Sequence, residues 1–268
     1  MFTPQKHVTT RILRTILIMA PLALLLATAP LSAQQTNVTR FDVYGGYAFL
    51  NSSAVNLFEN GFAVQIGVRP TTWLSLGFDY NLAAGDLTIK QTQLLPKLQA
   101  GLTPAALGQL IQLLKATGQA PATYQPPSSL TVPAHSRTQT YTLGPELVYR
   151  HFTKATIFVR PLYAGIIHET ATPKPQDPLV KALVFGLHGL PGGLPDVPGL
   201  LTGSSKTDNV FFYGFGGGFD ILFNNHFAWR VQSDLVRDHL FNDLLTDSRW
   251  TVRFSTGPAF NFGKNIVK

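Results

Sequence analysis

The chain has 268 residues, a net charge of +7 and no cysteine. The absence of cysteine fits a protein that is exported through an oxidising compartment. No cluster of basic residues follows the first 33 residues, so the charge pattern excludes nucleic acid as a partner.

The N-terminal segment has the pattern of a secretory signal peptide. Lys6, Arg11 and Arg14 precede an apolar run over 16–26, and small residues end at Ala33. The run is shorter than the ~20 residues of a membrane-spanning helix and contains Pro21. The sequence therefore predicts a cleaved signal peptide over 1–33 and a mature chain over 34–268, and its removal lowers the net charge from +7 to +4.

Eight later segments alternate apolar and polar residues with a period of two, which is typical of strands whose two faces differ. The segments are 40–50, 61–69, 73–82, 138–150, 156–168, 210–222, 227–235 and 250–262. In the fifth segment Arg160 and His168 share a parity with Leu162, so we expect a β-bulge near Pro161.

Ten charged residues lie on the polar side of this alternation, opposite a continuous apolar and aromatic face. They are Asp42, Asp79, Glu146, Asp220, Asp234, Arg69, Arg150, Arg160, Arg230 and Arg253. A face so aromatic and unbroken indicates a sheet turned inside out, as in a membrane-spanning barrel. An eight-stranded barrel is just wide enough for side chains to fill it, and an isolated buried ion is costly. We therefore expect these acids and arginines to pair as a plug, with Gly214, Gly216 and Gly218 making room for the arginines.

The connections between the segments alternate between short and long. Short turns are predicted at 70–72, 151–155 and 224–225, and longer loops at 51–60, 83–137, 169–209 and 236–248. Short turns at one rim and long loops at the other are typical of an outer-membrane barrel. We predict an all-β fold: an eight-stranded antiparallel up-and-down transmembrane β-barrel with two long, partly helical extracellular loops, 83–137 and 169–209. Ten strands remain an alternative, because 83–137 has room for another hairpin.

The order of these features resembles the small OmpA/OmpX-type outer-membrane β-barrel family. The resemblance rests on the signal peptide, the opening strand around 41–47 and the closing aromatic strand around 257–262, which ends in Phe260 and Phe262. It implies a place in the bacterial outer membrane, contact with outer-membrane lipid, and recognition of the last strand by the barrel-assembly machinery during insertion.

The two long loops are more apolar than exposed loops usually are. Thr103 and Pro104 begin, and Gly118 ends, a predicted amphipathic helix, and 91–102 contains a second one broken by Pro96. The residues that we single out for apolar contacts are Leu107, Leu110, Ile111, Leu114, Phe185, Leu187 and Leu190. Mutual packing into a cap is the favoured explanation, because long loops need an apolar core to be ordered. A patch for a lipid, an apolar small molecule or a partner protein is the alternative.

No catalytic, cofactor or metal site is predicted. His168 beside Glu169 and His239 beside Asp238 are the nearest to a catalytic pair, but neighbours in a strand point to opposite faces. The predicted role is structural or surface recognition through the loops. A small-solute pore, a carrier of apolar ligands and a lipid-modifying enzyme are the alternatives.

Overall fold

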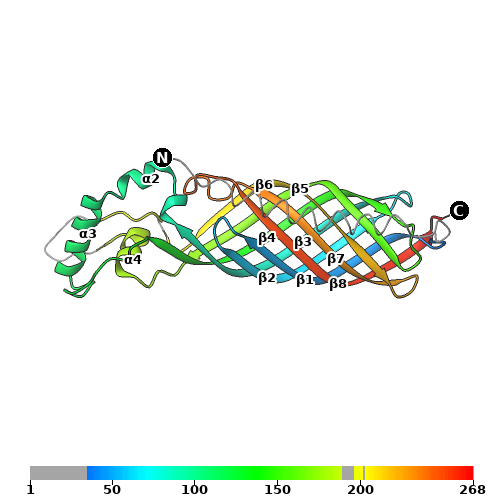
Figure 1. The fold of residues 1–268 in the computed structure, drawn as a ribbon, viewed down its shortest axis with the longest axis horizontal. Helices are drawn as coiled ribbons and strands as arrows, with labels where there is room; N and C mark the ends of the chain where they lie inside the picture. The colour runs from blue at the N-terminus through cyan, green and yellow to red at the C-terminus, as the bar shows by residue number, and fades with distance from the viewer. Residues whose placement is uncertain (1–34, 189–195, 202, 268) are drawn as a thin grey trace, which may run out of the picture.

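The computed structural model describes residues 35–188, 196–201 and 203–267, so the predicted signal peptide 1–33 and Leu190 lie outside the described residues. Eight antiparallel strands form one closed ring in chain order (Figure 1). The strands are β1 (Thr39–Ser52), β2 (Leu57–Val68), β3 (Leu74–Lys90), β4 (Thr131–Tyr149), β5 (Ala155–Pro173), β6 (Lys206–Leu222), β7 (Phe227–Asp238) and β8 (Arg249–Asn265). The predicted fold class is confirmed, and 83–137 holds no further hairpin.

The two ends of the ring differ as the loop lengths predict. The turn end carries the short connections 69–73, 150–154 and 223–226. The loop end carries 53–56, 91–130, 174–205 and 239–248. The strands run further towards the loop end than predicted: β3 continues to Lys90 and β4 begins at Thr131, so the long loops are shorter than 83–137 and 169–209. The predicted loop 51–60 is wrong, because β1 and β2 stay paired up to Ser52 and Leu57.

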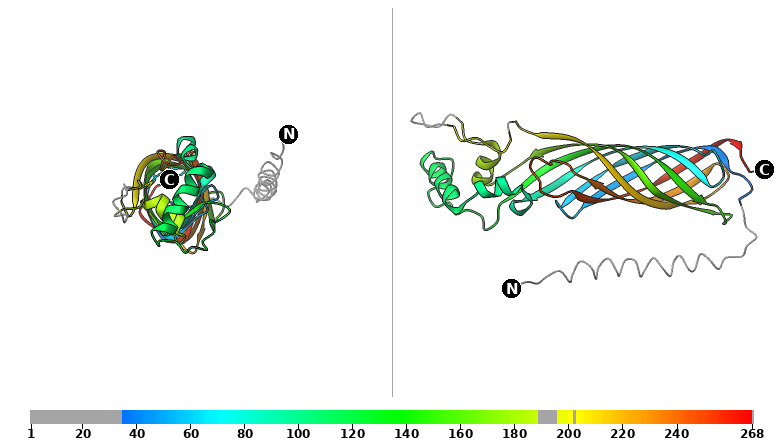
Figure 2. Two further views of the ribbon diagram at one scale, coloured as in Figure 1. Left: turned by 90° about the vertical axis from the view of Figure 1, so that its left-hand side faces the viewer. Right: turned by 90° about the horizontal axis from the view of Figure 1, so that it is seen from above.

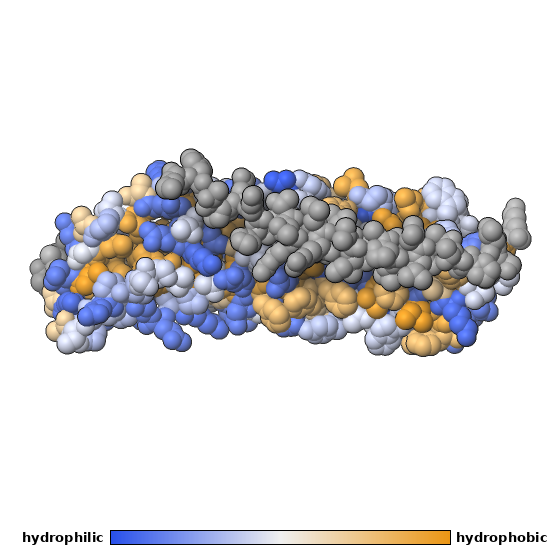
Figure 3. All heavy atoms as spheres, in the orientation of Figure 1, coloured by the Kyte–Doolittle hydropathy of each residue, from blue (hydrophilic) through white to orange (hydrophobic). Residues whose placement is uncertain are grey.

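Large apolar side chains cover the outside of the ring. Phe211 is 69% exposed and Leu143 is 64% exposed, and similar residues project from every strand. Figure 3 shows these hydrophobic residues along the strands, with hydrophilic residues more frequent around the helices. A continuous exposed apolar surface of this kind is what hydrocarbon requires of a barrel.

A β-bulge in β5 sets which residues face the inside of the ring, the lumen. The register with β6 shifts between Arg160 and Tyr163, which confirms the irregularity predicted near Pro161. Phe158 and Arg160 point inward before the shift, and Tyr163 and Ile167 do so after it. The shift therefore keeps both halves of a long strand in step with one lumen.

Within the described residues, helices occupy the loop end only. They are η1 (Gln91–Gln93), α2 (Pro96–Gly101), α3 (Pro104–Ala116) and α4 (Pro178–Phe185), and the end-on view of Figure 2 shows them across one mouth of the ring. As predicted, Thr103 caps α3: its side-chain oxygen accepts a hydrogen bond from Ala106 N at 3.1 Å. None of the helices in the described ranges is long and apolar enough to cross a membrane.

The helix α4 lies in the loop 169–209, which was expected to be partly helical, but its position was not predicted. Asp177 caps it by accepting hydrogen bonds from Leu179 N at 2.9 Å and Val180 N at 3.1 Å, and Pro178 occupies its first turn. The Asp–Pro pair is a helix-start signal in the sequence that was not used to locate this helix.

Candidate functional site: the charged lumen

The structure places nine of the ten predicted charged residues inside the ring, and the first group lies nearest the turn end. Arg230 forms a two-pronged contact with Asp220, through Nε to Oδ1 at 2.7 Å and Nη2 to Oδ2 at 2.9 Å. Its Nη2 also lies 3.2 Å from Asp42, whose other oxygen is 3.2 Å from Arg69. Two acids and two arginines thus form a balanced chain across the lumen.

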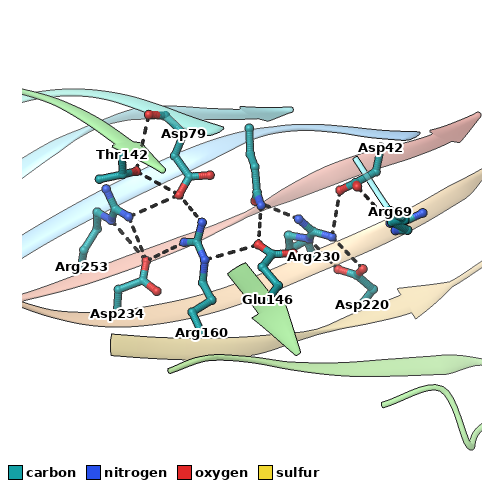
Figure 4. Close-up of polar contacts among 11 residues, drawn as sticks. Asp42, Arg69, Asp79, Thr142, Glu146, Arg160, Asp220, Arg230, Asp234 and Arg253 are labelled. Carbon is teal, nitrogen blue, oxygen red and sulfur yellow. Dashed lines mark hydrogen bonds and ion pairs between the residues drawn. The ribbon is translucent and has the colours of Figure 1, made fainter. Parts of the chain in front are cut away.

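A second group lies next to the first, further towards the loop end (Figure 4). Arg160 is fully buried and contacts three carboxylates: Asp79, Glu146 at 3.3 Å and Asp234 at 3.4 Å. Arg253 reaches Asp234 at 3.0 Å and Asp79 at 3.7 Å. These contacts come from five strands, so the group fastens opposite walls of the barrel to one another.

Gln65 joins the two groups. Its side-chain nitrogen donates to Glu146 at 2.5 Å, and its side-chain oxygen accepts from Arg230 at 2.8 Å. The nine charged residues therefore form one continuous polar network. Removing one member leaves its buried neighbours with fewer partners, and the cost of that loss can exceed what the pair itself contributes.

Two of the arginines stack on aromatic rings. The guanidinium carbon of Arg160 lies 4.9 Å from the centre of the Tyr163 ring, and that of Arg230 lies 4.9 Å from the Phe158 ring. A Cβ atom added to Gly214 would lie 2.6 Å from Leu235 O and 3.1 Å from the Tyr163 ring, and one added to Gly218 would collide with Val231 O and lie 2.8 Å from the Phe158 ring. The prediction that these glycines make room for arginines is therefore wrong.

Gly214 and Gly218 instead leave room for the backbone of β7 and for the aromatic rings against which the arginines stack. Gly216 differs from the other two, because a Cβ atom there would collide with the Asp234 side chain. The small residues of β6 thus position the network indirectly, through two rings and one acid.

A third charged group near the loop end escaped the sequence reasoning. Arg249 donates from Nε to Asp238 at 2.8 Å and also contacts Glu169, while Glu59 accepts from the Thr138 hydroxyl at 2.9 Å. All four charged residues are buried. The signal was present, because Glu59 has the inward parity of Gln65 on the same strand and of Arg69 just after it. The group was missed because the predicted segments 61–69, 156–168, 227–235 and 250–262 stop short of Glu59, Glu169, Asp238 and Arg249.

Arg150 is a correction to the predicted network. It follows the end of β4, is only half-buried, and donates to Thr72 O at 3.0 Å and to Gln35 Oε1 at 3.3 Å. Among the described residues it makes no ion pair with a carboxylate. Burial, followed by the nearby cation Arg69, lowers the pKa of Arg150 to about 10. Since β4 ends at Tyr149, this arginine lies on the rim rather than in the plug.

The apolar loop residues pack mainly on each other. Leu114 and Leu187 are buried in one cluster, on which Leu107, Leu110 and Ile111 pack as partly buried neighbours. Phe185 is half-buried at the end of α4. Two apolar cavities lie elsewhere at the loop end, lined by other residues such as Ile89, Leu94 and Leu200, and they measure only about 20 and about 40 Å³. This arrangement favours the packing explanation over a ligand pocket.

The two histidine–acid pairs do not meet. Glu169 points into the lumen towards Arg249, whereas the ring of His168 contacts Asn209 at 2.5 Å. Asp238 likewise contacts Arg249, and His239 is exposed. No group of three metal-ligating side chains comes together within the described residues.

The closed ring, the apolar outer surface and the polar lumen together define a small eight-stranded transmembrane β-barrel. No family model matches the chain, and no curated protein matches its sequence significantly. The chain is similar to several solved structures, and this similarity concerns the fold only.

Three solved outer-membrane structures illustrate the likeness. The attachment invasion locus protein Ail of Yersinia pestis, solved with a heparin analogue, is 10% identical over 84% of this chain and 99% of its own, with a TM-score of 0.42. Neisserial surface protein A is 12% identical over 83% and 97%, with a TM-score of 0.44. OprG from Pseudomonas aeruginosa is 10% identical over 87% and 100%, with a TM-score of 0.48.

Proposed function

We propose that this chain is an integral outer-membrane protein whose lumen is plugged by its own ion pairs, and that it acts in a structural or surface-recognition role through the loop end. The observation that carries the proposal is the continuous network from Asp42 to Arg253, which spans the lumen between opposite strands. A barrel filled in this way supports loops without offering a wide path for solutes.

The loop end is the part suited to recognition. The helices α3 and α4 project beyond the strands in Figure 1, and their apolar faces pack together into one cluster. The other sides of these helices stay exposed, for example at Gln109 and Lys181. A rigid, folded cap on a closed barrel presents a fixed polar surface to the outside of the cell.

The absence of cysteine provides a clean test of this orientation. Single substitutions Gln109→Cys, on α3, and Asn225→Cys, in the β6–β7 turn, place one thiol at an exposed position of each end. On intact cells a membrane-impermeant maleimide should label Gln109→Cys alone, and Asn225→Cys should react only after the outer membrane is opened. Labelling of Asn225→Cys on intact cells would contradict the proposed orientation.

A matching test addresses the barrel itself. Closed outer-membrane barrels keep their structure in SDS until they are heated, because no strand has a free edge at which unfolding begins. Unboiled protein should therefore migrate differently from boiled protein. Identical mobility of the two samples would contradict the closed, detergent-resistant ring.

A further inference from the structure

The turn end holds a polar cavity of about 220 Å³ that the plug does not use. Its lining comes from the N-terminal segment before β1, the end of β2, the two turns at 150–154 and 223–226, and the end of β8. Three of the lining residues are cations: Arg69, Arg150 and Lys154. Amide side chains, including Asn224 and Asn261, complete the wall.

Positive charge exceeds negative charge around this cavity. The nearby acids are already engaged, because Asp42 pairs with Arg69 and Arg230, and Asp220 pairs with Arg230. That group of two acids and two arginines is neutral. Arg150 and Lys154 therefore contribute charge that no carboxylate of the described residues balances.

Unused hydrogen-bond donors accompany this charge. Arg69 is 3% exposed, and its Nε atom is buried without an acceptor, although its terminal nitrogens donate to Thr39 O and Asn261 Oδ1. Arg150 donates only to neutral oxygens, those of Thr72, Gln35 and Thr156. Arg69 has a carboxylate partner, Asp42, but its Nε–H has no acceptor, and Arg150 has no carboxylate partner among the described residues. A buried donor without an acceptor and a partly buried cation without an anion are both unfavourable, and an anion in the cavity would satisfy both.

We propose that this cavity binds a phosphate group through Arg150, Arg69 and Lys154. Planar guanidinium groups match the oxygens of a phosphate, which accept several charge-assisted hydrogen bonds at once. Burial and the neighbouring Arg69 lower the pKa of Arg150 more than Asp220 and Asp42 raise it, and this is the direction expected where a further anion would be favourable.

Two sources can supply such a group. One is free inorganic phosphate. The other is a phospholipid, because Thr153 and Lys154 also border an open apolar groove of about 1070 Å³ on the lipid-facing surface, where Gly217 and Ser233 form a low point between larger side chains. An acyl chain in this groove would bring its phosphate to Lys154.

Inorganic phosphate tests the site directly. The protein is folded in dodecyl maltoside, whose headgroup carries no phosphate, and the side-chain Nε–H signals of Arg69 and Arg150 are followed by NMR as phosphate is added. We expect saturable shifts at both signals, and about tenfold weaker binding in Arg150→Gln because one charge-assisted contact is lost. Lys97→Gln, an exposed cation on α2 at the loop end, should bind like the wild type. Shifts that do not saturate, or that chloride reproduces at equal ionic strength, would overturn the proposal.

Native mass spectrometry separates the two sources. If the phosphate belongs to a lipid, phosphatidylglycerol should stay bound to the wild type and to Lys97→Gln, whereas diacylglycerol, which lacks the phosphate, should not. Binding of inorganic phosphate without retention of phosphatidylglycerol would support the site with free phosphate as its ligand. Retention of phosphatidylglycerol that Arg150→Gln leaves unchanged would contradict the role of Arg150. Each variant is first checked for the heat-dependent mobility of a folded barrel.

Discussion

The barrel and the cap bury opposite kinds of side chain. The lumen encloses Arg160 among carboxylates, whereas the cap encloses Leu114 among other apolar residues. Lipid surrounds the barrel wall, so apolar side chains gain little by leaving that surface, and the interior is held by charge pairing and hydrogen bonds. Water surrounds the cap, so burial of apolar surface stabilises it in the ordinary way. Charge pairing and hydrogen bonds therefore stabilise the interior of the barrel within the membrane, whereas burial of apolar surface stabilises the cap outside it.

The largest effect should come from breaking the network in the barrel. Arg160→Met leaves Asp79, Glu146 and Asp234 facing each other without their shared cation. We expect the free energy of unfolding to fall by about 3–5 kcal/mol, as for other buried pairs that lose one partner. Urea titration of the protein in lipid vesicles measures this loss. Arg237→Met, which removes an outward-facing arginine of β7, is the control and should change stability by less than about 1 kcal/mol. Equal losses for both variants would show that the network adds nothing to the barrel.

A smaller and local effect should follow from a cavity in the cap. Leu114 is 1% exposed, so Leu114→Ala should destabilise the packing of α3 on α4 by about 2–4 kcal/mol. Because this cluster lies outside the ring, hydrogen exchange should rise in α3 and α4 and stay unchanged in the strands. Gln112→Ala, on the exposed side of α3, should leave both unchanged. Faster exchange throughout the strands would contradict the separation of cap and barrel.

The hydrogen bond that the Thr103 side chain accepts at the N-terminus of α3 should contribute less still to stability. Thr103→Ala removes the hydrogen bond from Ala106 N, and we expect a loss of about 1 kcal/mol within the helix. Exchange of the first-turn amides measures it, and Thr103→Ser, which keeps the acceptor oxygen, should restore the wild-type rate. If serine fails to restore the rate, the side-chain cap is not what stabilises this turn.

The smallest effect concerns pH at the exposed loop. His188 Nδ1 lies 3.0 Å from Asp196, and this contact raises the pKa of His188 above its ordinary value of ~6.5. The contact therefore adds stability below pH ~6.5, and that contribution disappears as the pH rises through the raised pKa. NMR titration of the imidazole should show the upward shift, and Asp196→Asn should reduce it to the smaller part that comes from the Phe185 carbonyl. A pKa that is the same in both proteins would contradict the pairing.

The sequence determined more of the barrel wall than of its ends. Alternation along β1 to β8 predicted which face is apolar, since a strand places successive side chains on opposite sides. It did not show where pairing stops, because β2 and β3 stay paired through charged and small residues such as Glu59 and Gly85, at which the clear alternation is lost. Strand ends that project past the lipid need no apolar side chains, so their hydropathy resembles that of a loop.

The sequence predicted which charged residues face the lumen, but it did not predict which of them form ion pairs with each other. Parity brought Asp42, Asp79 and Arg160 to one face, yet it gave no information on which arginine meets which acid. That choice depends on register, on the β5 bulge and on the aromatic rings beneath the arginines. Arg150 shows the limit of parity, because it continues the alternation of β4 while lying one residue beyond its end.

Conductance across a planar lipid bilayer tests the closed lumen most directly. Wild-type protein of verified heat-dependent mobility should insert without producing a steady ion current, because paired side chains such as Arg160 with Glu146 and Arg230 with Asp220 fill the lumen. A steady open level whose conductance grows with salt concentration would contradict the plug and favour the alternative of a small-solute pore.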